Sequence, residues 1–189
     1  MTTQLEGVPE AQVDRLRELA HVGASWAANS LAQMMDATIL TRVPVVYGPD
    51  RFRVRSTWTT GIFCDFEGAM SGTVGIFLSE EGRARVLQTL CTSSDVSVEY
   101  TASVLCEFGN ILASQTVTAM ADLAGGVILP SLPELVRNQA ESVFAARLAP
   151  RSGTPRPLYI ESELFDRSGS LRALHVVVPD MPKAPSEAG

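Results

Sequence analysis

Four polar side chains follow one face of a predicted helix in the second half of the chain. They are Ser103, Glu107, Asn110 and Ser114, spaced by four, three and four residues. At about 100° per residue, this spacing places them on the same side of a helix. A solvated helix face without a function is one explanation of such a stripe. The residue types also allow a specific chemistry.

That chemistry is the positioning of a water molecule. A carboxylate such as Glu107 can pair with a cation of a partner, and a carboxamide such as Asn110 both donates and accepts hydrogen bonds. The stripe contains no activated nucleophile. Phosphoryl transfer does not require one, because it depends mainly on alignment and charge stabilisation. An oriented water attacking a phosphorus atom is therefore a reaction that this face can assist.

Two long helices are predicted, over residues 9–36 and 96–124, the second ending at Gly125 and Gly126. On the second helix the stripe opposite Glu107 is expected to face the core: Val98, Ala102, Leu105, Gly109, Leu112, Thr116, Ala119 and Leu123. The first helix has an inward stripe of Val13, Leu16, Ala20, Gly23, Ala27 and Met34. Its outward stripe is Asp14, Glu18, His21 and Ser25.

The remaining chain favours β-strands with two lesser helices. Strands are predicted over 38–47, with Pro44 at an edge or bulge, and over 52–65, 69–78 and a short segment reaching Pro130. Residues 157–165 and 171–179 form a predicted hairpin. Helices are predicted from Ser79 to about 92 and over 134–147, and a linker over 150–156. The Pro-, Ser- and Gly-containing end of the chain is predicted to be disordered.

The chain also contains an internal repeat. An offset of 89 residues pairs eight identical residues between positions 14 and 44 and their counterparts, among them Glu18 with Glu107 and Pro44 with Pro133. Two amphipathic helices of similar composition are the alternative explanation, but the paired prolines lie outside the helices. We therefore expect an α+β fold with a pseudo-twofold repeat, in which two long helices pack on a mainly antiparallel β-sheet. Residues 1–182 would form one domain with repeats at about 9–92 and 96–180, followed by a disordered tail at 183–189.

Composition excludes several classes of function. A net charge of −6 and a pI of about 4.9 argue against a nucleic-acid partner. No apolar run is long enough for a membrane helix, and the N-terminus lacks a signal-peptide pattern. The three widely spaced cysteines indicate reduced thiols in a cytoplasm, and the two distant histidines provide no metal-ligand cluster.

The segment from Ser103 to Pro133 resembles the signature of the CheC/CheX/FliY phosphatases. In that signature an Asp or Ser is followed after three residues by Glu, after two more by Asn and after 22 more by Pro. Ser103, Glu107, Asn110 and Pro133 match all four positions. The similarity extends over about residues 10–180.

The first half of the chain matches the same signature incompletely. Asp14, Glu18 and Pro44 have the family spacing, but His21 stands where the family has Asn. An imidazole also has one donor and one acceptor, but its reach and shape differ from those of a carboxamide. We interpret the first site as degenerate, with Glu18 retaining weak docking. An exposed His21 without any task is the simpler alternative.

The resemblance implies a substrate and residue roles. The substrate would be the phospho-aspartyl form of a CheY-type response regulator. Glu107 would pair with a lysine of the regulator and Asn110 would orient the attacking water, with Ser103 and Ser114 as further binding residues on the same face. The required Mg²⁺ belongs to the regulator, so the chain itself would need no cofactor. The receptor deamidase CheD is a second candidate partner. A non-catalytic module that binds a response regulator, CheD or a flagellar switch component is the alternative function.

Overall fold

The computed structural model describes residues 9–54, 57–92, 97–149 and 157–180. In chain order its elements are α1 (Glu10–Met35), β1 (Ile39–Thr41), β2 (Val45–Tyr47), the 3₁₀ turn η1 (Pro49–Arg51), β3 (Thr60–Gly68), β4 (Gly72–Leu78), α2 (Glu80–Leu90), α3 (Val98–Ala124), β5 (Ile128–Pro130), β6 (Glu134–Arg137), α4 (Ala140–Arg147), β7 (Tyr159–Asp166) and β8 (Arg172–Pro179). The predicted linker at 150–156 and tail at 183–189 lie outside the described residues.

All strands in the described residues belong to one antiparallel sheet that is shared between the two halves of the chain. Its order is β1-β7-β8-β4-β3-β5, with β2 also paired to β7 and β6 also paired to β3. The short strands of each half therefore pair with the long hairpin of the other half, and β4 and β8 meet in the centre. Strands β1 and β5 begin at positions separated by the offset of the repeat, and so do β2 and β6. This arrangement confirms the predicted α+β, pseudo-twofold fold class; the exact repeat boundaries stay predictions.

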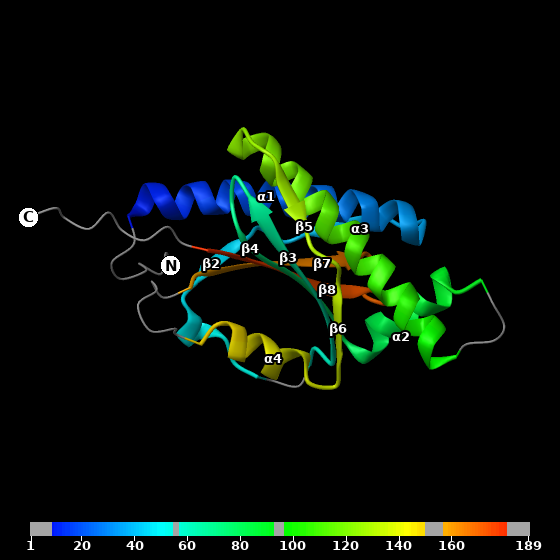
Figure 1. Ribbon diagram of the computed structural model, residues 1–189. Coiled ribbons are helices and arrows are strands. Elements are labelled where there is room, and N and C mark those ends of the chain that lie inside the picture. Colours follow the sequence, from blue (N-terminus) through cyan, green and yellow to red (C-terminus); the bar gives the residue numbers. More distant parts are fainter. Residues whose placement is uncertain (1–8, 55–56, 93–96, 150–156, 181–189) are drawn as a thin grey trace, which may run out of the picture.

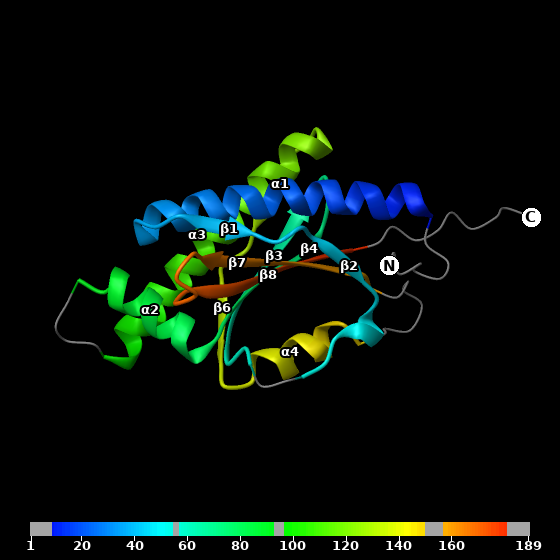
Figure 2. The same ribbon diagram turned by 180° about the vertical axis from the view of Figure 1, so that it is seen from behind.

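The helices cover both faces of the sheet. Helices α1 and α3 cross on one face, and α4 lies against the other (Figures 1 and 2). At the crossing, a Cβ on Gly23 would stand 2.9 Å from Cγ2 of Thr116, so the absence of a side chain lets the helices approach closely. The main core lies under this pair, and a smaller aromatic core, including Phe63, Phe77 and Phe144, lies under α4.

Helix boundaries follow local signals. The Oγ of Ser79 accepts a hydrogen bond from the Gly82 N–H, and the Oγ of Ser97 accepts one from the Tyr100 N–H. Gly125, with φ of 69°, ends α3 in the left-handed conformation. The predicted bounds of both long helices and of the final hairpin are therefore confirmed to within a few residues.

Two predicted elements are wrong in part. Residues 52–54 and 57–59 are not in a strand; β3 begins at Thr60, and the Thr57 and Trp58 N–H groups donate instead to the buried Glu141 carboxylate. The predicted helix over 134–147 is divided, because its first residues form β6 along the free edge of β3. Asn138, with φ of 66°, separates this strand from α4. Pairing with a distant strand has overridden helix propensity here.

The predicted inward stripe of α1 is buried from Val13 to Ala27, with Met34 half-buried, whereas that of α3 is buried only along the middle of the helix. Leu105, Leu112 and Thr116 are buried, whereas Val98 and Leu123 are 62% and 43% exposed. Exposure therefore increases toward both ends of α3, although Ala124 still packs against the core. Within the described residues, no helix is long and apolar enough to cross a membrane.

Candidate functional site

The polar stripe of α3 lies on the exposed side of the helix, as its spacing predicts. Glu107 is exposed, and Asn110, one turn further along, is half-buried. Within the described part of the chain, neither side chain forms a hydrogen bond or ion pair. Both therefore remain available to an incoming partner, one as an anion and the other as a hydrogen-bonding amide.

The two serines of the stripe differ in availability. Ser103 is exposed, but its Oγ donates a 3.0 Å hydrogen bond to the Glu99 carbonyl of its own helix. Ser114 is half-buried. The structure thus places Ser103, Glu107, Asn110 and Ser114 together on one face, with the Glu and Asn at its centre.

Asn110 lies on the flank of α3 that borders β3. Cys106 precedes it by four residues and so shares this flank. Cys64, on β3, is buried, which raises the pKa of its thiol to about 11, and the charges of Asp65 and Cys106 add to this effect. Helix α3 packs closely on β3 here, since a Cβ on Gly109, the residue before Asn110, would stand 2.2 Å from Ile62 Cγ2 of β3. All three cysteines of the chain are unpaired.

The spacing of 22 residues between Asn110 and Pro133 has a geometric reason. From Asn110 to the end of α3 at Ala124 the helix rises by about 21 Å, at about 1.5 Å per residue. The chain then turns back, and the extended segment from Gly126 to Pro133 covers about 23 Å at about 3.3 Å per residue. Pro133 therefore returns to the level of Asn110. The 3.3 Å hydrogen bond from Arg137 Nη2 to the Val98 carbonyl, at the other end of α3, fits the same antiparallel course.

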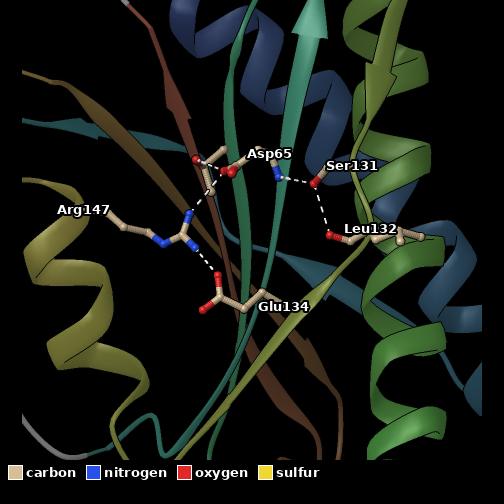
Figure 3. A network of polar contacts seen from close by, with 6 residues as sticks. Asp65, Ser131, Leu132, Glu134 and Arg147 are labelled. Atoms are coloured by element: carbon tan, nitrogen blue, oxygen red, sulfur yellow. Dashed lines mark hydrogen bonds and ion pairs between the residues drawn. The ribbon is translucent and has the colours of Figure 1, made fainter.

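A network of polar contacts holds the β5–β6 connection that carries Pro133 (Figure 3). The Ser131 N–H donates to the Asp65 carbonyl over 2.7 Å, and Ser131 Oγ accepts from the Asp65 N–H over 3.0 Å. On the other face of the sheet, Arg147 of α4 pairs with both Asp65 and Glu134 and stacks on the Phe63 ring. Sequence reasoning did not find this network, because Asp65 and Arg147 are 82 residues apart and only the sheet brings them together.

The corresponding face of α1 is assembled but differs in composition. Glu18 and His21 are both exposed, and Asp14 pairs with Arg17 over 2.8 Å. Ser25 Oγ donates to the His21 carbonyl. Glu18 borders a shallow depression between α1 and the end of α3, where Leu123 lies. The face of α1 thus keeps the carboxylate, Glu18, but lacks the amide, because His21 stands in its place.

The second histidine is structural. His175 of β8 is buried, and its Nε2 lies 2.9 Å from Thr116 Oγ1 of α3. Burial lowers its pKa to about 4, which keeps the ring neutral at physiological pH. The described residues contain no group of three or more His, Cys, Asp or Glu side chains arranged to hold a metal ion.

Comparison with known proteins points to one family. The model of the CheC-like family matches residues 101–137, which include the whole segment from Ser103 to Pro133. The CheY-P phosphatase CheC of Bacillus subtilis (strain 168) is 28% identical, over 92% of this chain and 90% of its own. The resemblance to the CheC-like family is confirmed.

Solved structures show the same CheC-like fold. The chemotaxis protein CheX of Desulfovibrio desulfuricans superimposes with a TM-score of 0.62 at 12% identity, covering 85% of this chain and 97% of CheX. FliY of Thermotoga maritima gives 0.62 at 14% identity, with 91% of each chain covered. The CheX of a CheX–CheY–BeF3–Mg complex from Borrelia burgdorferi gives 0.61 at 14% identity, with 87% and 99% covered. At these identities the likeness concerns the fold alone.

Proposed function

We propose that this protein is a phosphatase that accelerates hydrolysis of the aspartyl phosphate of a CheY-type response regulator in the cytoplasm. The observation that carries the proposal is the unpartnered Glu107 and Asn110 pair at the centre of the exposed face of α3. Pro133 completes the family pattern at the same level of the helix. The name of the Bacillus subtilis relative and the CheY partner of a fold neighbour support this function.

In the proposed mechanism Asn110 enters the active site of the regulator and holds the attacking water through its carboxamide. The water oxygen forms a bond to phosphorus while the bond between phosphorus and the aspartyl oxygen breaks. The electron pair stays on the regulator's carboxylate, and inorganic phosphate leaves with the oxygen and the protons of the water. The residue contributes alignment rather than covalent chemistry. Mg²⁺ belongs to the regulator in this proposal, and the present chain contributes no cofactor.

Glu107 has a docking role in the same proposal. Its exposed carboxylate pairs with a lysine beside the phosphorylation site of the regulator, which sets the register of the complex. Ser103 and Ser114 extend the contact along the helix. In the first half, Glu18 supports at most weak docking, because His21 replaces the amide. CheD as a partner stays a prediction.

A non-catalytic adaptor for a regulator, CheD or a switch component is the second candidate, favoured by the loss of Asn at position 21. The two candidates differ in what Asn110 does. We expect Asn110→Ala to abolish accelerated decay of the phosphorylated regulator and to leave regulator binding within about threefold of wild type. Gln115→Ala, which removes another carboxamide from α3, is the matched control and should retain activity. Binding without any acceleration of decay by the wild-type protein would favour the adaptor.

The docking role has its own test. Glu107→Lys places like charges opposite each other and should weaken binding to the regulator by tenfold or more, about 1.4 kcal/mol. Asp122→Lys makes the same charge change about 22 Å further along α3 and should leave affinity unchanged. Equal affinities of the two variants would contradict the proposed register.

A further inference from the structure

The most exposed large apolar side chain among the described residues stands beside the proposed site. Leu132, in the β5–β6 connection, is 90% exposed, and Leu129 of β5 is 66% exposed. A leucine so exposed contributes little to folding stability, because its apolar surface stays in water. Exposed apolar surface of this kind often marks a contact with a partner.

Leu132 is connected to Asn110 through contacts with β3. Ser131, the preceding residue, pairs with Asp65 of β3, and Ile62 of the same strand packs against Gly109, the residue before Asn110 on α3. The return of the chain after α3 brings residues 132 and 133 to the level of Asn110. In Figure 3, Leu132 lies on the side of the β5–β6 connection where α3 runs, away from Arg147. The leucine, Asn110 and Glu107 therefore share one edge of the molecule.

The connection is held in place rather than loose. Asp65 is bonded through its backbone to Ser131, and its carboxylate accepts from Thr73 Oγ1 over 2.6 Å and from Arg147 over 3.2 Å. Arg147 also pairs with Glu134, on the far side of Pro133. Residues on both sides of Leu132 are thus tied to β3 and α4, and a pre-organised side chain loses little entropy when it binds.

The repeat places the same feature in the first half. The offset of 89 residues sets Val43 on Leu132, and Val43, at 79%, is the next most exposed large apolar residue described. The Arg42 N–H donates to the Glu163 carbonyl over 2.9 Å, as the Ser131 N–H donates to Asp65. A fixed, exposed apolar residue before the proline is therefore a feature of the repeating unit.

We infer that Leu132 is an apolar anchor that docks the phosphorylated response regulator beside Glu107 and Asn110. This inference rests on the proposed function and names the part of the surface that determines affinity. Leu132 contacts an apolar patch of the regulator adjoining its phosphorylation site, while Glu107 supplies the charged contact and Asn110 the chemistry. Leu132 touches no reacting atom, so it acts on affinity and not on the chemical step.

The test compares Leu132→Ser with two matched variants. Leu132→Met keeps an apolar side chain, and Val127→Ser removes one that is 72% exposed on the turn before β5, away from Asn110. Dephosphorylation is followed at increasing concentrations of a CheY-type regulator that has been phosphorylated with acetyl phosphate. Dissociation constants are measured with the same regulator carrying beryllium fluoride.

We expect Leu132→Ser to raise both KM and Kd about tenfold, the scale for losing one buried leucine, with kcat unchanged. Leu132→Met and Val127→Ser should stay within twofold of wild type. An unaltered melting temperature should accompany every variant, because the replaced side chains are exposed. If KM and Kd are unchanged in Leu132→Ser, the anchor is overturned. The phosphatase proposal still stands in that case, provided that the wild-type protein is active and Asn110→Ala is not. Absence of both binding and activity in the wild-type protein would overturn both proposals.

Discussion

Acidification should destabilise this protein through one buried histidine. His175 is 1% exposed, and burial lowers its pKa from 6.5 to about 4. Between these two values the unfolded chain binds a proton at this residue and the folded chain does not. By linkage, the free energy of unfolding therefore falls as the pH falls from about 6.5, and the contribution of His175 is fully lost below about pH 4.

The magnitude follows from the shift. A change from 6.5 to about 4, at about 1.36 kcal/mol per pKa unit, corresponds to about 3 kcal/mol, most of it lost by pH 4.5. Hydrogen bonding agrees with a neutral ring. Thr116 Oγ1 donates to the Leu112 carbonyl over 2.9 Å, so its oxygen accepts from the Nε2–H of His175. Among the described residues no acceptor is found for a second ring proton.

The assay is urea unfolding of the wild type and of His175→Gln between pH 7.5 and 4.5. The glutamine amide can still donate to Thr116 but does not titrate, and the acidic residues are common to both proteins. The stability of the wild type relative to the variant should therefore decline by about 2–3 kcal/mol over this interval. A difference that stays constant would refute the reasoning. If the variant does not fold, an NMR titration of the His175 ring with a midpoint near 6.5 would refute it equally.

Two further predictions concern the helices that carry the two faces. Gly109→Ala places a Cβ 2.2 Å from Ile62 Cγ2, so α3 must move away from β3; we expect unfolding free energy to fall by about 1–2 kcal/mol despite the better helix propensity of alanine. In urea unfolding the exposed Thr118→Ala serves as control, and wild-type stability of Gly109→Ala would argue against this close packing. His21→Asn restores the amide on α1, and we expect dephosphorylation to rise by less than twofold; the control is the same substitution combined with Glu18→Ala. A doubling of turnover or more would show that the first face lacks only its amide.

Local sequence was sufficient for the elements whose signals are short-range. Ser97 and Gly125 determine where α3 begins and ends, because a serine cap and a left-handed glycine act within one turn. The hairpin of β7 and β8 was likewise predictable from alternation and a polar turn. The candidate site could be predicted from the sequence for the same reason, since Glu107 and Asn110 lie one turn apart on a single helix.

The errors fall where a residue's state depends on a distant partner. Glu134 begins a strand because it pairs with the free edge of β3. The residues next to Glu134 in the sequence carry no signal of that pairing. Val98 matches the apolar stripe of α3 but is exposed, because it lies at the start of the helix, before the buried stretch that begins at Leu105. Periodicity reports which face of a helix is apolar, not how far the surface below it extends.

By itself, the sequence determined the two long helices, the repeat and the polar pair on α3, because each is encoded by spacing within a turn or by an offset along the chain. Only the tertiary structure decided that each half completes the sheet of the other and that Leu132 returns to the level of Asn110. It also decided that Asp65, Arg147 and Glu134 hold that connection. These features join residues many positions apart, and such contacts form only when the strands pair and the helices pack upon them.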